Sequence, residues 1–466
     1  MVNHCLAYGI LHKIYHEKYL ARVCNEFEPY FKTRTMIKDI LDGLQLLYTM
    51  DERPWVVGYS GGKDSTMIAA LVFDAIKGLP SEKRTKEVCI VCTDTRVEIP
   101  VVVARVQGEL NAMNAHSAEC GLNIQAYLLK PPSQQSFWVN IIGRGYPPPN
   151  RTFRWCTQRL KIDPVSTFIR GKLGHWGEAI ILLGARQSES GSRAQTLAAR
   201  AKNDFGLRRH DDLPRCWIST PIEHLSTFEV WDYLMQNECT WGGDNQALFQ
   251  LYKDASGGEC PLVVDQSTPS CGNSRFGCWT CTVVDRDKAS EGLLATGDTR
   301  MAALLDFRET LIHFRDPENG YRDMVRKNGQ EGPGPLKIEA RKELLLKLLV
   351  LQEESGLPVI SEEELHWIQT YWNSARKPDD GTGVVNIIFQ QKGDAMPDSR
   401  DDAYLKEIEQ RVTNQKEISL DTLRRLVAKV EEYSESHRAF GLPDELLQII
   451  QDDLRERQTE KGDVHA

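Results

Sequence analysis

The feature that most constrains the fold is the stretch WVVGYSGGKDSTMIAALVF at residues 55–73. Val56 and Val57 are typical of the end of a buried strand, residues 60–65 of a tight loop, and the apolar spacing from Thr66 onward of a helix. A strand, a glycine loop and a helix N-terminus in this order aim free backbone amides at an anion. The stretch therefore predicts an α/β fold with a phosphate site, which indicates a nucleotide ligand.

The loop SGGKDS carries residues suited to a nucleotide. Gly61 and Gly62 allow the backbone to approach a phosphate closely, and Lys63 adds a compact positive charge. Asp64 is a candidate magnesium ligand. The loop does not have the GxxxxGK[ST] pattern of NTPases, which cleave the terminal phosphate. The alternative interpretation is a glycine-rich turn without a ligand.

SGGKDS resembles the PP-loop of the ATP pyrophosphatases, which split ATP between its α and β phosphates to give pyrophosphate and an adenylated substrate. Three further segments follow in the order and spacing of the phosphoadenosine phosphosulfate (PAPS) reductase-like branch; they read TDTRVEIP, RWCTQRLKIDP and AIILLGARQSESGSR. PIEHLSTFEVWDYL, at residues 221–234, resembles the closing helix of that branch. The resemblance implies the adenine nucleotide alpha hydrolase-like fold, which is a doubly wound parallel sheet.

The same resemblance implies the residues of a nucleotide site. The loop would hold pyrophosphate and Asp64 magnesium, while Lys161 and Arg186 would stabilise the charge that develops during transfer. Asp94 and Thr95 end a predicted strand, the usual ligand position in an open α/β sheet. Taken singly, Asp94 could instead cap a helix, and the arginines could lie in surface ion pairs. The implied nucleotide-binding residues are Ser60, Gly61, Gly62, Lys63, Asp64, Ser65, Asp94, Thr95, Arg186 and Arg193.

A chain of 466 residues is long enough for two or three domains. No apolar run reaches the about 18 residues that span a membrane, and the first residues read as an amphipathic helix, so we expect a cytoplasmic protein without a membrane partner. Residues 377–400 are expected to form a loop or hairpin. The expected segments are a helical one at 1–50, a PP-loop domain at 51–250, a cysteine-rich segment at 251–330 and a mainly helical region at 331–466.

Twelve cysteines in a cytoplasmic protein are better explained by metal or redox chemistry than by disulfides. Four of them are concentrated in GGECPLVVDQSTPSCGNSRFGCWTCTVVD: Cys260, Cys271, Cys278 and Cys281. The last two form a C-x-x-C pair that can face one ion or cluster, and four thiolates suit zinc and a [4Fe-4S] cluster about equally. Buried cysteines in an apolar loop are the alternative.

CGNSRFGCWTCTVV, taken with the PP-loop segments, is similar to the DndC family, the iron-sulfur sulfurtransferases of DNA phosphorothioation systems. The similarity covers about residues 55–285 and favours the [4Fe-4S] cluster over zinc. It implies Cys260, Cys271, Cys278 and Cys281 as metal ligands, with Cys156 as the alternative to the more distant Cys260.

Cys156 stands in the RWCT element, close to the expected nucleotide. There it would serve as a relay cysteine that carries a persulfide delivered by a cysteine desulfurase, and Arg154 and Arg159 would favour its thiolate. The alternative is a small buried residue behind the nucleotide.

The charge distribution supports two opposite expectations about nucleic-acid binding. The net charge of −9 argues against a protein that binds DNA tightly by itself. Residues 144–172, however, carry seven basic residues and one acid, together with Tyr146, Phe153 and Trp155. These residues could follow a phosphate backbone, or the charges could serve ATP alone.

The resemblance to the DndC family implies an ATP-dependent sulfurtransferase that adenylates a DNA phosphate and replaces a non-bridging oxygen with sulfur. The implied catalytic residues are Lys63, Asp64, Cys156, Lys161 and Arg186. The implied cofactors are ATP, Mg²⁺ and the [4Fe-4S] cluster. The implied partners are DNA, a cysteine desulfurase and other Dnd-type modification proteins.

Three other functions stay open at this point. PAPS and adenylylsulfate reductases share the fold but resemble one another in a redox cysteine near the C-terminus, and no cysteine follows Cys281. A tRNA thiolase shares the adenylation chemistry and normally carries a recognisable RNA-binding module, which we do not find in the sequence. A nucleotide-gated scaffold of a modification complex is the non-enzymatic alternative.

Overall fold

The computed structural model describes residues 34–189, 195, 202–203, 205–256, 276–373, 383–391 and 425. The chain divides into two compact units, Met1–Val384 and Val385–Ala466, and the site described below lies in the first. The predicted site residues Arg193, Cys260 and Cys271 lie outside the described residues. The four segments expected from the sequence remain predictions.

A six-stranded sheet organises the first unit, in the order β3-β2-β1-β4-β6-β5. All neighbouring strands are parallel except β5 and β6. Strands such as WVVG and AIIL are continuously apolar because both faces of a parallel sheet are buried. The predicted doubly wound α/β fold is thereby confirmed. The strands are β1 (Trp55–Gly58), β2 (Val88–Thr93), β3 (Ile124–Leu129), β4 (Ala179–Leu182), β5 (Arg208–Arg209) and β6 (Cys216–Ser219).

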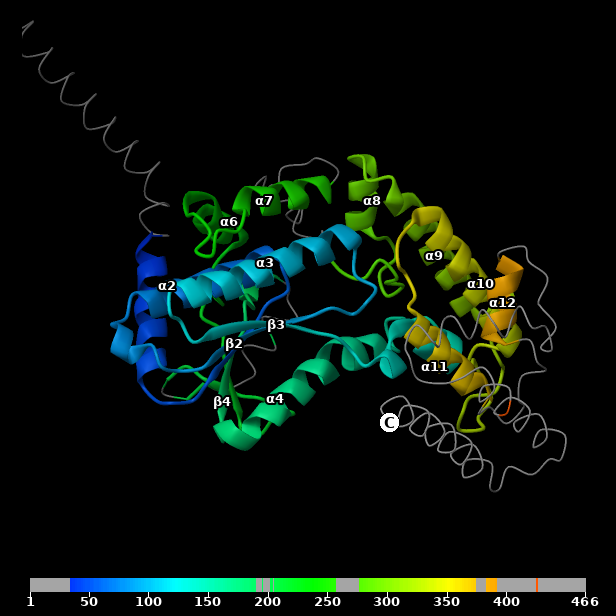
Figure 1. Ribbon diagram of the computed structural model, residues 1–466, viewed down its shortest axis with the longest axis horizontal. Helices are drawn as coiled ribbons and strands as arrows, with labels where there is room; N and C mark the ends of the chain where they lie inside the picture. Colours follow the sequence, from blue (N-terminus) through cyan, green and yellow to red (C-terminus); the bar gives the residue numbers. More distant parts are fainter. Residues whose placement is uncertain are drawn as a thin grey trace, which may run out of the picture. The chain divides into compact units, whose positions relative to one another are not determined.

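Helices cover both faces of this sheet: α2 and α3 lie on one face and α4 on the other (Figure 1). α4 packs Ile169 and Leu173 against Val56, Cys89 and Ile181 of the sheet. Residues 34–49 are also helical, and α6 confirms the predicted closing helix. The helices of this part are α2 (Lys63–Lys77), α3 (Pro100–Glu119), α4 (Asp163–Trp176), α6 (Thr227–Gln236) and α7 (Asn245–Asp254).

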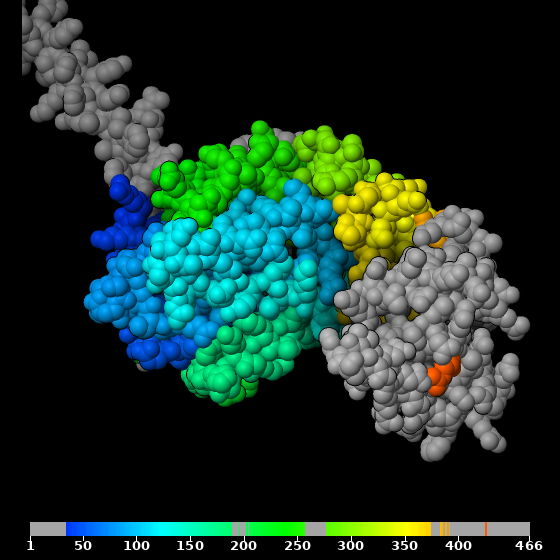
Figure 2. Space-filling model, viewed as in Figure 1, coloured from blue at the N-terminus to red at the C-terminus, as the bar shows by residue number. Residues whose placement is uncertain are grey.

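A second group of helices follows the cysteine segment. α10 begins at Ile338, within the region expected to be mainly helical. The stretch VVNIIFQQ, expected as part of a loop or hairpin, is instead helical, because Val384 and Ile387 recur at helical spacing and are buried. Figure 2 shows α9 and α10, in yellow, on the side of the first unit away from residues 34–49, in dark blue. The helices are α8 (Lys288–Ala295), α9 (Arg300–Arg315), α10 (Ile338–Ser355), α11 (Glu362–Asn373) and α12 (Val384–Gln391).

Helix α11 and the segment before it pack against residues 138–142 through tryptophans. Trp138 donates its ring N–H to the carbonyl of Val359 at 2.7 Å, and Trp372 donates to the carbonyl of Ile142 at 2.9 Å. All of the helices in the described ranges are too short or too polar to span a membrane.

A buried charge cluster lies just after β6, around Glu223. The Glu223 side chain is 2% exposed, accepts a hydrogen bond from Thr220 Oγ1 at 2.6 Å, and pairs with Arg208 Nη1 at 2.9 Å and with Lys202. Burial alone would raise the pKa of Glu223, but the hydrogen bonds from Lys202, Thr220 and Arg208 outweigh it and lower the pKa to about 2.

This shift predicts a pH-dependent stability. Because the folded-state pKa is depressed, the contribution of Glu223 is complete above the ordinary value of 4.5 and is lost as the pH falls toward 2. We expect Glu223→Gln to lower the free energy of unfolding by about 2 kcal/mol at pH 7, and the difference from the wild type to shrink as the pH falls to about 3, in urea titrations. A difference that stays constant over this range would contradict the charge-based explanation.

Candidate active site

The glycine loop between β1 and α2 is shaped to take a phosphate. Gly61 has a φ of +73°, and a Cβ atom added there would lie 2.4 Å from Cγ2 of Val106, so both conformation and space require glycine. Gly62 precedes α2 in extended conformation, and no side chain caps the helix at this residue. α2 consequently begins at Lys63, three residues earlier than expected, and its N-terminal amides lie at the loop.

Ser60, Ser65 and Tyr252 brace this loop. Ser65 Oγ accepts a hydrogen bond from the amide of Ser60 at 3.1 Å and donates to the carbonyl of Gly62 at 2.9 Å. Tyr252, from α7, accepts a hydrogen bond from the Lys63 amide at 3.3 Å, and its ring lies 5.3 Å from the Lys63 ammonium. Nothing in the local sequence marked Tyr252 as part of the site, because α7 reaches the loop only through the fold.

Arg186 and Asp64 form a buried ion pair beside the loop. Arg186 Nε lies 2.6 Å from Asp64 Oδ1, and Lys63 Nζ lies 3.1 Å from Asp64 Oδ2. The Arg186 side chain is 1% exposed and also donates to Ser188 Oγ and to the carbonyl of Leu225. Arg186 therefore orients the predicted magnesium ligand and is not in the surface ion pair considered as its alternative. Its contact with phosphate remains a prediction.

Asp94 and Thr95 lie after β2, at the edge of the sheet where the glycine loop follows β1. Asp94 Oδ1 accepts a hydrogen bond from the amide of Arg96 at 2.8 Å, and Asp94 Oδ2 lies 3.4 Å from Lys130 Nζ. Thr95 turns to the cysteine segment: its hydroxyl lies 3.2 Å from the sulfur of Cys278. Their predicted position at the strand end is confirmed, and their predicted nucleotide contacts remain untested by these distances.

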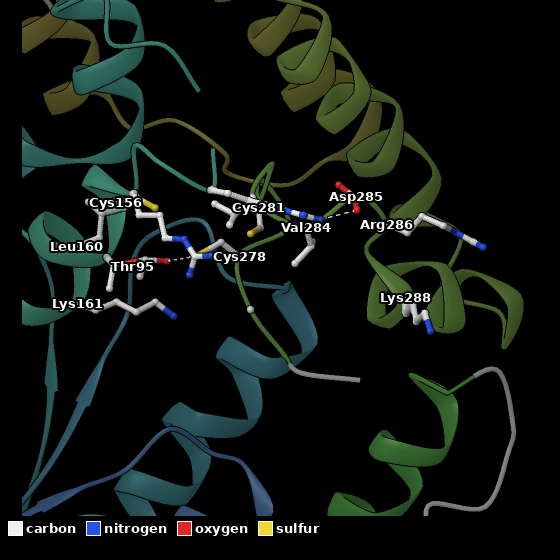
Figure 3. A pocket seen from close by; sticks show the side chains of 15 residues that line it. Thr95, Cys156, Leu160, Lys161, Cys278, Cys281, Val284, Asp285, Arg286 and Lys288 are labelled. Carbon is white, nitrogen blue, oxygen red and sulfur yellow. Dashed lines mark hydrogen bonds and ion pairs between the residues drawn. The ribbon is translucent and has the colours of Figure 1, made fainter. Parts of the chain in front are cut away.

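Three cysteines meet in one cavity of about 780 Å³ at this edge of the sheet (Figure 3). Cys278 and Cys281 come from the loop before α8, and Cys156 from the residue before a π-helical segment, Thr157–Ile162. Lys161 belongs to that segment and lines the same cavity. A backbone bridge between Glu98 and Cys278 and a hydrogen bond from the Trp279 amide to the carbonyl of Val97 at 3.0 Å fix the C-x-x-C loop to the chain after β2.

Glu98 is a site residue that sequence reasoning missed. Its Oε1 accepts a hydrogen bond from Thr95 at 3.0 Å, lies 3.3 Å from Lys161 Nζ, and lies 3.8 Å from the sulfur of Cys278. Burial and the Glu98 carboxylate raise the pKa of the Cys278 thiol. Burial by itself would lower the pKa of Lys161. The neighbouring Cys278 and Glu98 raise this pKa by more than burial lowers it, so the ammonium stays charged. The quoted segment TDTRVEIP contains Glu98, but only the fold brings it to the thiol.

The environment of Cys156 differs from the expectation. Burial, and then the neighbouring Cys281, raise the pKa of the Cys156 thiol, so the expected thiolate is not favoured in this state. Arg159 was expected to favour the thiolate, but its guanidinium donates to Gln135 Oε1 and to the Tyr146 hydroxyl. Arg154 does line the cavity.

The basic stretch at 144–172 splits between two roles. Arg144 and Arg159 make contacts inside the protein, with Tyr371, Gln135 and Tyr146. Other members face the cavity, where they are joined by two basic residues that precede and begin α8. The basic residues that line the cavity are Arg151, Arg154, Lys161, Arg286 and Lys288, and the only acidic one in this lining is Asp285.

The described residues include part of the predicted metal site. Among them, no group of three or more His, Cys, Asp and Glu side chains is arranged to hold a metal ion. Two of the four predicted ligands, Cys278 and Cys281, open onto one cavity together with Cys156, the predicted alternative to Cys260. Thiols are the donors that both zinc and iron-sulfur clusters take, so the chemistry of these residues suits such a group, but the three thiols are not arranged here as its ligands.

Residues 54–284, just under half of the chain, match the family model of the phosphoadenosine phosphosulfate reductase domain, which belongs to the PP-loop superfamily. An uncharacterised protein from Methanocaldococcus jannaschii is 25% identical over 194 residues, which are 42% of this chain and 34% of the relative. The match therefore spans about a third of that relative's length.

Three solved structures match this chain at low similarity. A PAPS reductase from Candida auris has a TM-score of 0.28 and 14% identity, with 42% of this chain and 79% of that chain covered. The U34-tRNA thiolase NcsA from Methanococcus maripaludis, with its [4Fe-4S] cluster, has a TM-score of 0.27 and 13% identity. The match covers 60% of this chain and 80% of that chain. An NH3-dependent NAD synthetase from Campylobacter jejuni has a TM-score of 0.27 and 13% identity. The match covers 63% of this chain and 99% of that chain.

Proposed function

Since residues 54–284 form a domain of the PAPS reductase type, we propose that this protein is an ATP-dependent sulfurtransferase of DNA phosphorothioation. The observation that carries the proposal is the cavity in which Cys156, Cys278 and Cys281 share a wall with five basic side chains. Thiols suit the handling of sulfur, and basic side chains suit the phosphates of a polyanion. Three of the five also pair with carboxylates: Arg151 with Asp285, Lys161 with Glu98, and Arg286 with Glu291.

The proposed reaction begins with activation of the DNA phosphate, because a phosphodiester offers no leaving group at its non-bridging oxygens. One such oxygen attacks the α-phosphorus of ATP, the bond to the β-phosphate breaks, and pyrophosphate leaves. The oxygen is now part of an AMP leaving group. Ser60, Gly61, Gly62, Lys63 and Ser65 hold the pyrophosphate, and Asp64, oriented by Arg186, holds Mg²⁺.

Sulfur transfer follows from a persulfide on a cavity cysteine, for which Cys156 is our candidate. Its terminal sulfur attacks the activated phosphorus and AMP leaves, which joins the protein to the DNA through a disulfide-type bond. An external thiol then attacks the cysteine sulfur of that bond, and the DNA phosphorothioate leaves with the electron pair. A second external thiol opens the resulting mixed disulfide and restores the cysteine.

Lys161 and the metal site complete the proposal. Lys161 places its ammonium in the cavity and stabilises the negative charge that develops at the phosphorus. Cys278 and Cys281, with Cys271 and either Cys260 or Cys156, would hold a [4Fe-4S] cluster, which would supply a site that binds or positions sulfur.

The proposed partners follow from the chemistry. A cysteine desulfurase would load the persulfide in the cytoplasm, and other Dnd-type proteins would contribute the DNA affinity that a chain with a net charge of −9 does not supply alone. Asp94, Thr95 and Arg193 stay in the proposal as nucleotide contacts.

Mass spectrometry of nuclease-digested DNA and RNA tests the proposed substrate. Cells that carry the whole gene neighbourhood should contain phosphorothioate-linked dinucleotides, and cells in which only this gene is deleted should contain none. Unchanged DNA together with altered thionucleosides in tRNA would move the function to RNA thiolation.

Sulfonucleotide reduction is the second candidate, because the matched family model is that of a reductase domain. In that reaction cavity thiols would reduce a bound sulfonucleotide and release sulfite. Release of sulfite from PAPS or adenylylsulfate by the purified protein, with DNA and RNA unchanged in the cells, would favour it.

A further inference from the structure

Helix α9 reaches the cysteine cavity from beyond the matched domain, which ends at residue 284. Two arginines on α9, Arg308 and Arg315, are seven residues apart, so they lie on the same face of the helix. Both direct their guanidinium groups at backbone carbonyls of the loops that carry the cysteines.

Arg308 holds the loop of the C-x-x-C pair. Its side chain is 2% exposed. Nε donates to the carbonyl of Cys281 at 2.8 Å, and Nη2 donates to the carbonyls of Val284 and Asp285 at 2.5 and 3.2 Å. One guanidinium thus binds three carbonyls at and just after Cys281. The remaining Nη1 donates to Glu309 Oε1 at 2.5 Å.

Arg315 joins that loop to the one that leads to Cys156. Its Nη1 donates to the carbonyl of Thr282 at 2.5 Å and to the carbonyl of Pro149 at 2.9 Å. The Thr282 hydroxyl donates to the same Pro149 carbonyl at 2.6 Å. Pro149 belongs to the stretch PPPNRTFRWC, which ends at Cys156. The two cysteine loops are therefore fastened to each other at one buried point.

Burying a guanidinium group costs free energy unless its N–H donors have hydrogen-bond acceptors. The carbonyls of the cysteine loops supply such acceptors to the buried side chain of Arg308. Arginine offers five N–H donors in a planar fork, whereas lysine offers one compact ammonium group. A lysine in either position could keep the charge but could not reach carbonyls that point in several directions. Each missing hydrogen bond would leave a carbonyl of these loops without its charged donor.

We infer that Arg308 and Arg315 are positioning residues that fix the loop of Cys278 and Cys281 relative to the loop of Cys156. Helix α9 is then an integral part of the cysteine site. The inference holds whether the cavity serves DNA, tRNA or a sulfonucleotide, so it stands apart from the proposed function.

Amide hydrogen exchange, measured by mass spectrometry on the full-length protein, tests this. Arg308→Lys should speed exchange about tenfold in peptides that cover residues 277–285 and leave residues 147–156 as in the wild type. Arg315→Lys should speed exchange in both loops, because it removes the bond to Pro149 as well. Arg300→Lys is the matched control: Arg300 lies on the same helix, but its guanidinium pairs with Asp298, through hydrogen bonds of 2.8 and 2.9 Å, and not with the cysteine loops in the described part of the chain.

Two results would overturn the inference. One is unchanged exchange in both loops of Arg308→Lys and Arg315→Lys. The other is faster exchange that is uniform over the sheet strands and both loops, with a lowered melting temperature, which would indicate only general stabilisation. If an arginine variant does not fold, Thr282→Val, which removes only the hydroxyl bond to Pro149, should still speed exchange at residues 147–156.

Discussion

Lys63→Ala is expected to slow pyrophosphate release from ATP by about a hundredfold to a thousandfold. The ammonium of Lys63 lies at the glycine loop, where the proposed leaving pyrophosphate carries the charge that develops in the reaction. The fold should tolerate the change, because Asp64 keeps its ion pair with Arg186 at 2.6 Å and the loop keeps its serine bonds. The measurement is the rate of pyrophosphate release by the purified protein with DNA and the other modification proteins present.

Lys77→Ala is the matched control for this variant. Lys77 ends the same helix and is exposed, and its Nζ lies 3.4 Å from His116 Nε2. It should release pyrophosphate at the wild-type rate. If Lys63→Ala binds ATP and supports DNA modification as the wild type does, the protein is a scaffold and not the adenylating enzyme.

Cys278→Ser is expected to reduce DNA phosphorothioation at least a hundredfold while pyrophosphate release continues. Cys278 lies in the cysteine cavity, 3.2 Å from Thr95 Oγ1, whereas the glycine loop proposed to bind ATP is built from other residues. A serine hydroxyl is a poor substitute for a thiolate as a nucleophile or as a metal ligand. The measurement is the amount of phosphorothioate-linked dinucleotide in cells, together with the iron content of the protein purified without oxygen.

Cys120→Ser is the matched control for Cys278→Ser. Cys120 is a partly buried thiol at the end of α3, 3.5 Å from His116, and it does not line the cavity. It should leave both DNA modification and iron content unchanged. A Cys278→Ser protein with normal phosphorothioation would contradict the assigned role of the cavity, and one that also lost pyrophosphate release would point to a misfolded site.

Much of the nucleotide half of the site could be predicted from local sequence. Val56, Val57 and the glycines that follow reported a buried strand and a tight phosphate loop, because apolar runs and glycine positions depend on neighbours along the chain. The strand end at Asp94 was predictable for the same reason. VVNIIFQQ was assigned wrongly because its flanking glycines and prolines outweighed a helical spacing of only eight residues.

The cysteine half of the site needed the tertiary structure. The C-x-x-C spacing identified Cys278 and Cys281 as a pair, but Glu98 reaches Cys278 through a bridge between distant segments. From the sequence, Arg186 could either bind phosphate or lie in a surface ion pair. The fold instead buries its side chain against Asp64. A charged side chain chooses its partner by distance and burial, which no spacing along the chain reports.

The sequence by itself determined the strand, glycine loop and helix that make the phosphate site, and the presence of a paired-cysteine segment. Both depend on residues that are close along the chain and on backbone preferences that few residues satisfy. Only the tertiary structure decided that Cys156 joins the cysteine pair in one cavity, that Thr95 faces Cys278, and that α9 fastens the two cysteine loops together. These contacts join distant segments, and they form because the packed sheet and helices bring those segments within hydrogen-bonding distance.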